Sequence, residues 1–129
     1  MNTEMIKTVK NDQFAKLLGL ELITVDIGYA EVRMKIKEEH LNGLGIVQGG
    51  AIFTLADFAF AAAANAGGKV SVGINANINY FKPAKGKYLL AKATETSSSR
   101  SLGNYNVDIF DEDNEVLIAK FNATGFIKN

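Results

Sequence analysis

A long apolar segment with a single charge in it places the strongest constraint on how this chain can fold. Residues 49–65 are rich in alanine and phenylalanine, and Asp57 is the only charged side chain between Glu39 and Lys69. A helix on the surface of a protein normally shows a polar stripe, so this composition predicts a helix that is covered on nearly all sides. An ionised carboxylate in such surroundings is costly unless it has a partner, which makes Asp57 a functional candidate.

Segments with the pattern of β-strands flank this helix. Residues 30–37 alternate apolar and charged side chains without interruption, as expected for a strand with one buried face. Strands are predicted at residues 20–26, 30–37, 69–81, 87–96, 102–110 and 115–127. A short helix is expected at residues 12–18, with Asp12 as its N-cap and Gly19 as its stop. Strands joined by short turns indicate an antiparallel sheet, so the predicted class is α+β.

The overall composition excludes several classes of function. The 129 residues fit one domain, residues 1–129, with a modest core. Lysine plus arginine and aspartate plus glutamate both number 14, which argues against nucleic acid as the main partner. There is no cysteine and His40 is the only histidine, which excludes thiol chemistry and a multi-histidine metal site. No signal peptide or membrane-spanning stretch is recognisable, so the default expectation is a cytoplasmic protein with no membrane partner.

A glycine pair lies where the apolar helix should begin. A helix N-terminus supplies free N–H groups and a partial positive charge, and glycine allows a substrate to approach the backbone closely. The N–H of Gly49 or Gly50 is therefore a credible donor to an oxyanion. Asp57 is correspondingly a credible base or nucleophile for hydrolysis of an acyl bond.

The spacing of these residues determines how they could act together. Gly49 and Asp57 are eight positions apart, which is about 12 Å along one helix. Both would have to lie within about 3 to 3.5 Å of one reacting carbonyl. One helix cannot do this, but Asp57 of one chain can lie beside Gly49 of another in an antiparallel pair. If the two residues cooperate, the protein is an obligate dimer with shared sites. The apolar helix also favours a second subunit, because a single sheet covers only one of its sides.

Several motifs in the chain resemble a known family. The motifs are Asn42, Gln48–Gly50, Leu55–Asp57 and Asn77–Ala84. They resemble the hotdog-fold acyl-CoA thioesterases, and among these the subgroup typified by phenylacetyl-CoA-pathway thioesterases, over roughly residues 20–127. The resemblance implies an antiparallel sheet wrapped around a long central helix, and homodimers joined at their sheet edges and commonly paired into tetramers. It also implies an acyl-CoA substrate and no metal or redox cofactor.

The resemblance implies roles for individual residues. The family pairs an asparagine or glutamine and a glycine N–H from one subunit with an acidic residue from the other, and Asn42, Gly49 and Asp57 match these roles. The family commonly has His-Gly-Gly where this chain has Gln48-Gly49-Gly50, so no histidine role carries over at that point. The remaining substrate-binding candidates are Gln48, Gly50, Asn75, Lys82, Arg100 and His40. Of these, Lys82 and Arg100 are candidates for the phosphates of CoA.

Other interpretations of the same residues are also open. Asp57 could be a structural carboxylate bonded to hydroxyls or amides, and Asn42, in a glycine-rich loop, could be a turn residue. The whole domain could bind acyl-CoA without turnover. A hotdog hydratase or dehydratase would use a histidine paired with a carboxylate, and His40 is poorly placed for that role. The choice of acyl group, aryl or medium-chain, and the choice between base and nucleophile for Asp57 are left open.

Overall fold

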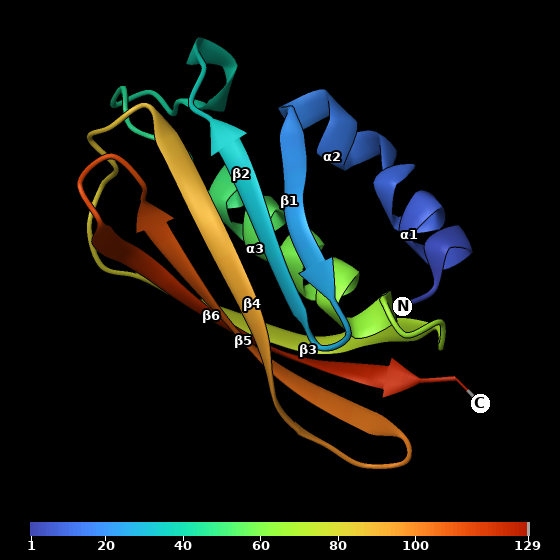
Figure 1. Cartoon of the computed structure of the whole chain (residues 1–129). Helices are drawn as coiled ribbons and strands as arrows, with labels where there is room; N and C mark the ends of the chain where they lie inside the picture. Colours follow the sequence, from blue (N-terminus) through green and yellow to red (C-terminus); the bar gives the residue numbers. More distant parts are fainter. Residues whose placement is uncertain (129) are drawn as a thin grey trace.

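One antiparallel sheet and one long helix packed against it dominate the computed structural model, which describes residues 1–128 (Figure 1). The helices are α1 (Thr3–Lys10), α2 (Gln13–Leu18) and α3 (Gly49–Asn65), with a short 3-10 helix at Glu38–His40. The strands are β1 (Leu20–Asp26), β2 (Tyr29–Lys35), β3 (Ser71–Tyr80), β4 (Tyr88–Ser98), β5 (Leu102–Asp111) and β6 (Val116–Ile127). Every predicted strand is confirmed, with ends within two residues of those expected.

The sheet has the strand order β1-β2-β4-β5-β6-β3, and all neighbouring strands are antiparallel. Helix α3 lies behind this sheet in the view of Figure 1, with the sheet curving around it. The predicted α+β class and the hotdog arrangement, a sheet wrapped around a central helix, are both confirmed. Among the described residues, no helix is both long and apolar enough to cross a membrane.

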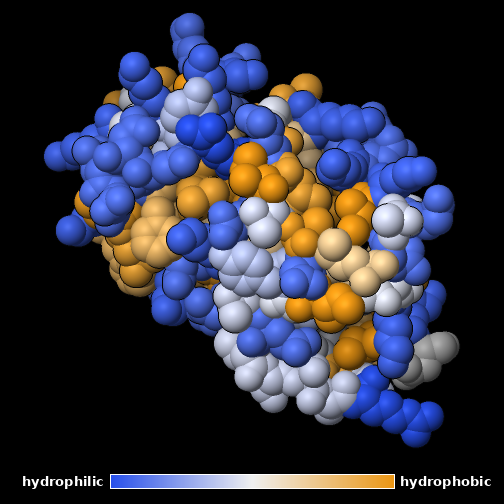
Figure 2. All heavy atoms as spheres, viewed as in Figure 1, coloured by the Kyte–Doolittle hydropathy of each residue, from blue (hydrophilic) through white to orange (hydrophobic). Residues whose placement is uncertain are grey.

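The two faces of the sheet differ in polarity, as the alternation predicts. On β2, Ala30, Val32 and Met34 are fully buried against α3. On the outer face, Lys92, Asp108 and Lys120 lie in register across β4, β5 and β6, and Lys120 Nζ is 3.3 Å from Asp108 Oδ1. Figure 2, in the same view, shows hydrophilic side chains over much of this face with apolar patches between them. The sheet therefore has one face in the core and one face exposed to solvent.

Strand β3 departs from the pattern of a half-buried strand. It pairs only with β6 and forms one edge of the sheet. Its apolar side chains are largely exposed, with Val72 at 53% and Ile74 at 60%. An edge strand with free backbone groups and exposed apolar side chains is a ready template for pairing with another chain.

Local signals explain both helices that the sequence predicts. Asp12 caps α2 by accepting a hydrogen bond from the Ala15 N–H at 2.9 Å, and Gly19, in the left-handed conformation, ends it. Helix α3 spans the predicted Gly49–Asn65. At its end the Asn65 side chain accepts from the Ser71 N–H and donates to the Ala61 carbonyl, which ties the helix to the start of β3.

The predicted coverage of α3 needs correction in two respects. Helix α1, which was not predicted from the sequence, lies with α2 against α3. These two helices of the same chain therefore cover part of the side of α3 that faces away from the sheet. A stripe along α3 nevertheless stays at least partly exposed. The stripe consists of Gly50, Phe53, Thr54, Asp57, Ala61 and Ala64. These positions recur at helical spacing, so one face of α3, with Asp57 in its middle, is open in the single chain.

Candidate active site

The first turn of α3 leaves one backbone donor free. Gln48 is the N-cap, and its Oε1 accepts a hydrogen bond from the Gly50 N–H at 2.6 Å. The N–H groups of Ala51 and Ile52 donate to the Gln48 carbonyl. The Gly49 N–H has no acceptor among the described residues. Of the two glycine N–H groups that the sequence left as candidates, only that of Gly49 is available to a ligand.

A hydrogen bond to its carbonyl also fixes the position of Gly49. The Tyr80 hydroxyl donates to the Gly49 carbonyl at 2.8 Å, and a Cβ atom at position 49 would lie 3.1 Å from the Tyr80 ring. Tyr80 was not among the predicted site residues, although it belongs to the 77–84 motif that carries the resemblance. Its contact could not be anticipated, because β3 and the start of α3 meet only in the folded chain.

Three predicted site residues line one cavity of about 350 Å³. They are Asn42, Gly49 and Lys82, which come from the loop before α3, the start of α3 and the segment after β3. The other lining residues are Ile46, Val47, Ile52, Tyr80, Phe81, Pro83 and Ala84. Gly49, Asn42 and Lys82 therefore border one largely apolar space.

Asn42 is a turn residue, and its amide nitrogen has no acceptor among the described residues. Its Oδ1 accepts hydrogen bonds from the Leu44 N–H at 2.9 Å and the Ile46 N–H at 3.3 Å, which shapes the loop as a turn. Because the oxygen is used in this way, the amide nitrogen is the group left to face a ligand. Asn42 can therefore donate a hydrogen bond into the cavity but cannot accept one there without breaking the turn.

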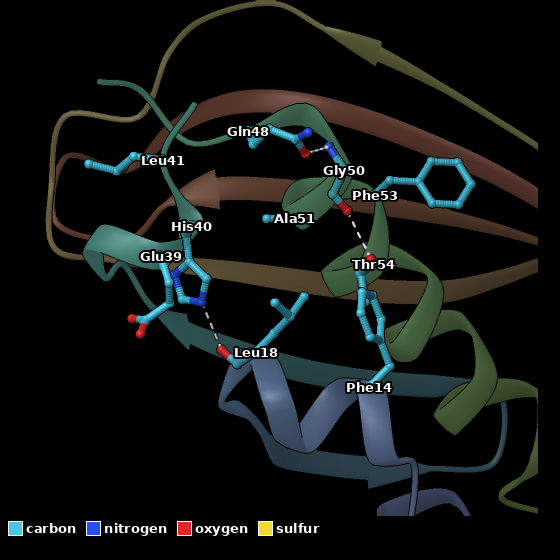
Figure 3. A pocket seen from close by; sticks show the side chains of 10 residues that line it. All are labelled: Phe14, Leu18, Glu39, His40, Leu41, Gln48, Gly50, Ala51, Phe53 and Thr54. Carbon is cyan, nitrogen blue, oxygen red and sulfur yellow. Dashed lines mark hydrogen bonds between the residues drawn. The ribbon is translucent and has the colours of Figure 1, made fainter. Parts of the chain in front are cut away.

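Three further predicted residues line a second cavity, of about 580 Å³ (Figure 3). They are His40, Gln48 and Gly50. The rest of the lining is Phe14, Leu18, Glu39, Leu41, Ala51, Phe53 and Thr54. Figure 3 shows Phe14 and Leu18 reaching from α2 toward the start of α3. Sequence analysis did not identify this contribution of α2.

His40 is fixed in the structure by both of its ring nitrogens. Its Nδ1 accepts from the Lys37 N–H at 3.0 Å, and its Nε2 lies 2.9 Å from the Leu18 carbonyl oxygen. These partners require the neutral ring with its proton on Nε2. The side chain is 2% exposed, so His40 lines the cavity as a structural side chain with no nitrogen free for a substrate.

Asp57 lies on the open stripe of α3 and borders neither cavity. The α3 side chains that form hydrogen bonds are those of Thr54 and Asn65, so no donor in the described chain holds the Asp57 carboxylate. Among the described residues of one chain, therefore, no hydroxyl or amide donor holds Asp57 as a structural carboxylate. Partial burial among apolar neighbours, and secondarily the Asp12 carboxylate, raise the pKa of Asp57 above its usual value.

Two predicted residues lie far from the start of α3 within one chain. Asn75, in the middle of β3, borders a small polar cavity with residues of β5 and β6. Arg100 is exposed in the turn between β4 and β5. In the described part of the chain, no group of three or more histidine, aspartate or glutamate side chains could hold a metal ion.

Comparisons with known proteins identify the family of this chain. Residues 44–118 match the family model of the thioesterase superfamily. The acyl-coenzyme A thioesterase PaaI of Escherichia coli is 34% identical over 109 residues, which cover 84% of this chain and 78% of that protein. Human acyl-coenzyme A thioesterase 13 is 30% identical over 131 residues, which cover 98% and 94%. The solved structure of the E. coli PaaI protein, from the phenylacetic acid degradation operon, superposes with a TM-score of 0.89 at 31% identity, covering 95% of this chain and 89% of that one.

Proposed function

The chain belongs to the thioesterase superfamily and is an acyl-CoA thioesterase with the hotdog fold, and from this premise we propose which of its residues carry out the hydrolysis. The thioester carbonyl accepts a hydrogen bond from the free Gly49 N–H, where the partial positive charge of the helix N-terminus stabilises the developing oxyanion. The Asn42 amide nitrogen donates to the substrate or to the attacking water. Asp57 of the partner subunit activates that water, or attacks the carbonyl itself.

The assignment of Asp57 to the partner subunit is supported by distances within one chain. Asp57 is absent from the cavity that holds Gly49 and Asn42, and the helical rise separates it from Gly49 by about 12 Å. The exposed edge of β3 gives a second copy a strand to pair with. The open stripe of α3 then offers an unoccupied helix face on which Asp57 points out of its own chain. We therefore propose a homodimer with two shared sites.

The free Gly49 N–H, in a cavity that also holds the Asn42 amide, is the observation on which this proposal mainly rests. The direct experiment is to measure release of free thiol from a panel of aryl- and fatty-acyl-CoAs. Hydrolysis of at least one class is expected. If none is cleaved, the activity is assigned wrongly; tight binding of acyl-CoA without turnover would then identify a binding module.

The second cavity supports the proposed range of acyl groups. It lies beside Gly50, next to the donor, and apolar side chains from α2 and α3 form much of its wall. A volume of about 580 Å³ accommodates an aryl or medium-chain acyl group. The same panel tests this range, because short acyl groups should have a higher KM than groups that fill this space.

A hydratase or dehydratase activity is disfavoured by His40. Such an enzyme needs a histidine nitrogen that exchanges protons with the substrate. Both ring nitrogens of His40 are engaged, with Lys37 and Leu18, and the ring is buried. No other histidine exists in the sequence.

Mixing two inactive variants is expected to restore activity if the sites are shared. Asp57→Ala removes the acidic residue, while Asn42→Asp keeps the loop acceptor and removes the amide donor. Random reassortment makes half of the dimers mixed, each with one intact site of two, so about a quarter of wild-type activity should return. The measurement is thiol release after subunit exchange, with each variant alone as the baseline. No recovery after proven exchange would contradict a site shared between subunits.

The pH profile is expected to respond to Asp12. Asp57 must be ionised to act, so kcat/KM should fall as pH decreases through its raised pKa. Asp12→Asn removes the neighbouring charge, while asparagine still caps α2. Losing this repulsion lowers the pKa of Asp57, so the acid limb of the kcat/KM profile should move to lower pH. An acid limb that stays in place, with α2 intact by circular dichroism, would mean that Asp57 does not control it.

A further inference from the structure

Two carboxylates, one at the end of β5 and one in the β5–β6 turn, hold the backbone of the loop between β3 and β4. Asp111 Oδ2 accepts hydrogen bonds from the N–H groups of Lys85 at 2.8 Å and Gly86 at 2.9 Å. Asp113 Oδ2 accepts from the N–H of Lys87 at 2.6 Å. Three consecutive backbone donors of the loop therefore point at acidic side chains from a different part of the sequence.

Asp111 is built into this arrangement. It is 2% exposed, and the Asn114 side chain also donates to its Oδ2, at 3.1 Å. Burial by itself acts to raise the pKa of Asp111. The hydrogen bonds from Lys85, Asn114 and Gly86 together outweigh it, so the pKa lies below its usual value. The carboxylate is thus kept ionised and bound to the loop at neutral pH.

Gly86 allows the close approach of the loop to the turn. A Cβ atom at this position would collide with Asp111 Oδ1 and would lie 2.8 Å from Asp113 Oδ2. Any larger residue would push the loop away from both carboxylates. The position of the loop therefore depends on three residues that touch neither Gly49 nor the cavity beside it.

The loop between β3 and β4 presents basic side chains next to the proposed thioester site. Lys82 and Lys85 line a cavity of about 570 Å³ together with Pro83, Asp111, Asn114 and Val116. Lys82 and Pro83 also border the cavity that contains Gly49, so the two spaces meet there. None of the ion pairs in the described chain involves Lys82, Lys85 or Lys87, which leaves their ammonium groups available to an anionic ligand.

We propose that Asp111 and Asp113 are positioning residues for the CoA moiety: they hold the loop so that Lys82 and Lys85 bind the phosphates of the CoA nucleotide. This inference rests on the proposed function. A substrate whose carbonyl lies at Gly49 extends past Pro83, and its polyanionic end then reaches the two lysines.

The direction in which CoA binding changes when Asp111 is substituted distinguishes positioning of the loop from electrostatic repulsion of the phosphates. A carboxylate beside a phosphate site repels phosphate, so removing its charge alone should strengthen CoA binding. If Asp111 acts by holding the loop, removing it should instead weaken CoA binding. Asp111→Ala removes both charge and acceptor, whereas Asp111→Asn removes the charge but keeps an oxygen that can accept from the loop.

The test compares an acyl-CoA with the corresponding acyl-pantetheine, which has the same thioester but no phosphate. For Asp111→Ala we expect KM for the acyl-CoA to rise by about tenfold, the loss of roughly one charge-assisted hydrogen bond. The KM for acyl-pantetheine, and kcat for both substrates, should stay within about twofold of wild type. Asp111→Asn should recover part of the loss. A fall in KM for acyl-CoA in both variants, or an equal rise for both substrates, would overturn the inference.

Matched variants keep the test decisive. Glu112→Gln removes a charge from the same turn, but Glu112 pairs with Arg33 and not with the loop, so KM should not change. Asp113→Ala and Gly86→Ala should raise KM for acyl-CoA selectively, and they decide the matter if Asp111→Ala does not fold. Lys85→Ala, at an exposed position, should also raise KM for acyl-CoA selectively. Unchanged KM values in Asp113→Ala, Gly86→Ala and Lys85→Ala would refute the inference. Failure of wild type to hydrolyse either substrate would instead refute the proposed function.

Discussion

Asp57→Asn is expected to lower kcat for acyl-CoA hydrolysis by about 10²- to 10⁴-fold, the usual contribution of a positioned base. The substitution keeps the shape of the side chain and removes its ability to accept a proton or attack a carbonyl. Nothing in the described chain donates a hydrogen bond to Asp57, so no structural interaction is lost. The measurement is the rate of thiol release at saturating acyl-CoA.

The same variant is expected to be at least as stable as wild type. The folded chain raises the pKa of Asp57, so the native state binds this proton more tightly than the unfolded state does. The free energy of unfolding therefore decreases as pH rises through that pKa. Asparagine resembles the neutral form, so Tm at neutral pH should be unchanged or higher. A residue that costs stability and supports activity is typical of a functional site.

A matched control for this prediction is Glu21→Gln. Glu21 is exposed on β1, so the substitution makes the same change in net charge away from the site. It should leave kcat and Tm near wild type. If Asp57→Asn hydrolyses acyl-CoA as fast as this control, Asp57 has no catalytic role.

Gly49→Pro is expected to lower kcat by about 10²- to 10³-fold, because it removes the N–H proposed to stabilise the oxyanion. The helix should tolerate the change. Gly49 is the first residue of α3, where proline is favoured and its missing donor would be unpaired in any case. Gln48, with φ −66° and ψ 137°, already has the extended conformation required before proline.

Gly49→Ala is the control that isolates the N–H. Alanine brings the same Cβ contact with the Tyr80 ring, at 3.1 Å, but keeps the backbone donor. The kcat of Gly49→Pro should therefore be far below that of Gly49→Ala, while both retain helical circular dichroism. Equal kcat values for the two variants would show that the Gly49 N–H does not stabilise the transition state.

The elements with strong local signals were predictable from sequence. Asp12 and Gly19 mark the ends of α2, and the apolar run sets the full extent of α3. The alternation in residues 30–37 identifies both β2 and its buried face. Helix α1 was missed because it buries no residue and its cap, Asn2, precedes a largely polar stretch. Its apolar side chains, Met5, Ile6 and Val9, recur at helical spacing but are only partly buried, and three such residues are too few to mark a helix in the sequence.

The site was predictable in its residue types and less so in their roles. The choice between Gly49 and Gly50 depends on a side chain, because Gln48 occupies the Gly50 N–H. Asn42 was considered either a turn residue or a ligand donor, and the loop bonds show that its oxygen serves the turn while its nitrogen stays free. Histidine is a residue type common in active sites, but the hydrogen-bond partners of His40, Lys37 and Leu18, give it a structural role.

By itself, the sequence determined the α+β class and the central helix with the candidates Gly49 and Asp57, because caps, periodicity and helical rise are local properties of the chain. The candidate Asn42 came from the family resemblance. Only the tertiary structure decided which donors are free and which loops adjoin the site. Asp111 and Gly86 are 25 residues apart in sequence, and Tyr80 and Gly49 are 31 apart. Their contacts arise from the antiparallel sheet and from the packing of α3 on it, which no local pattern encodes.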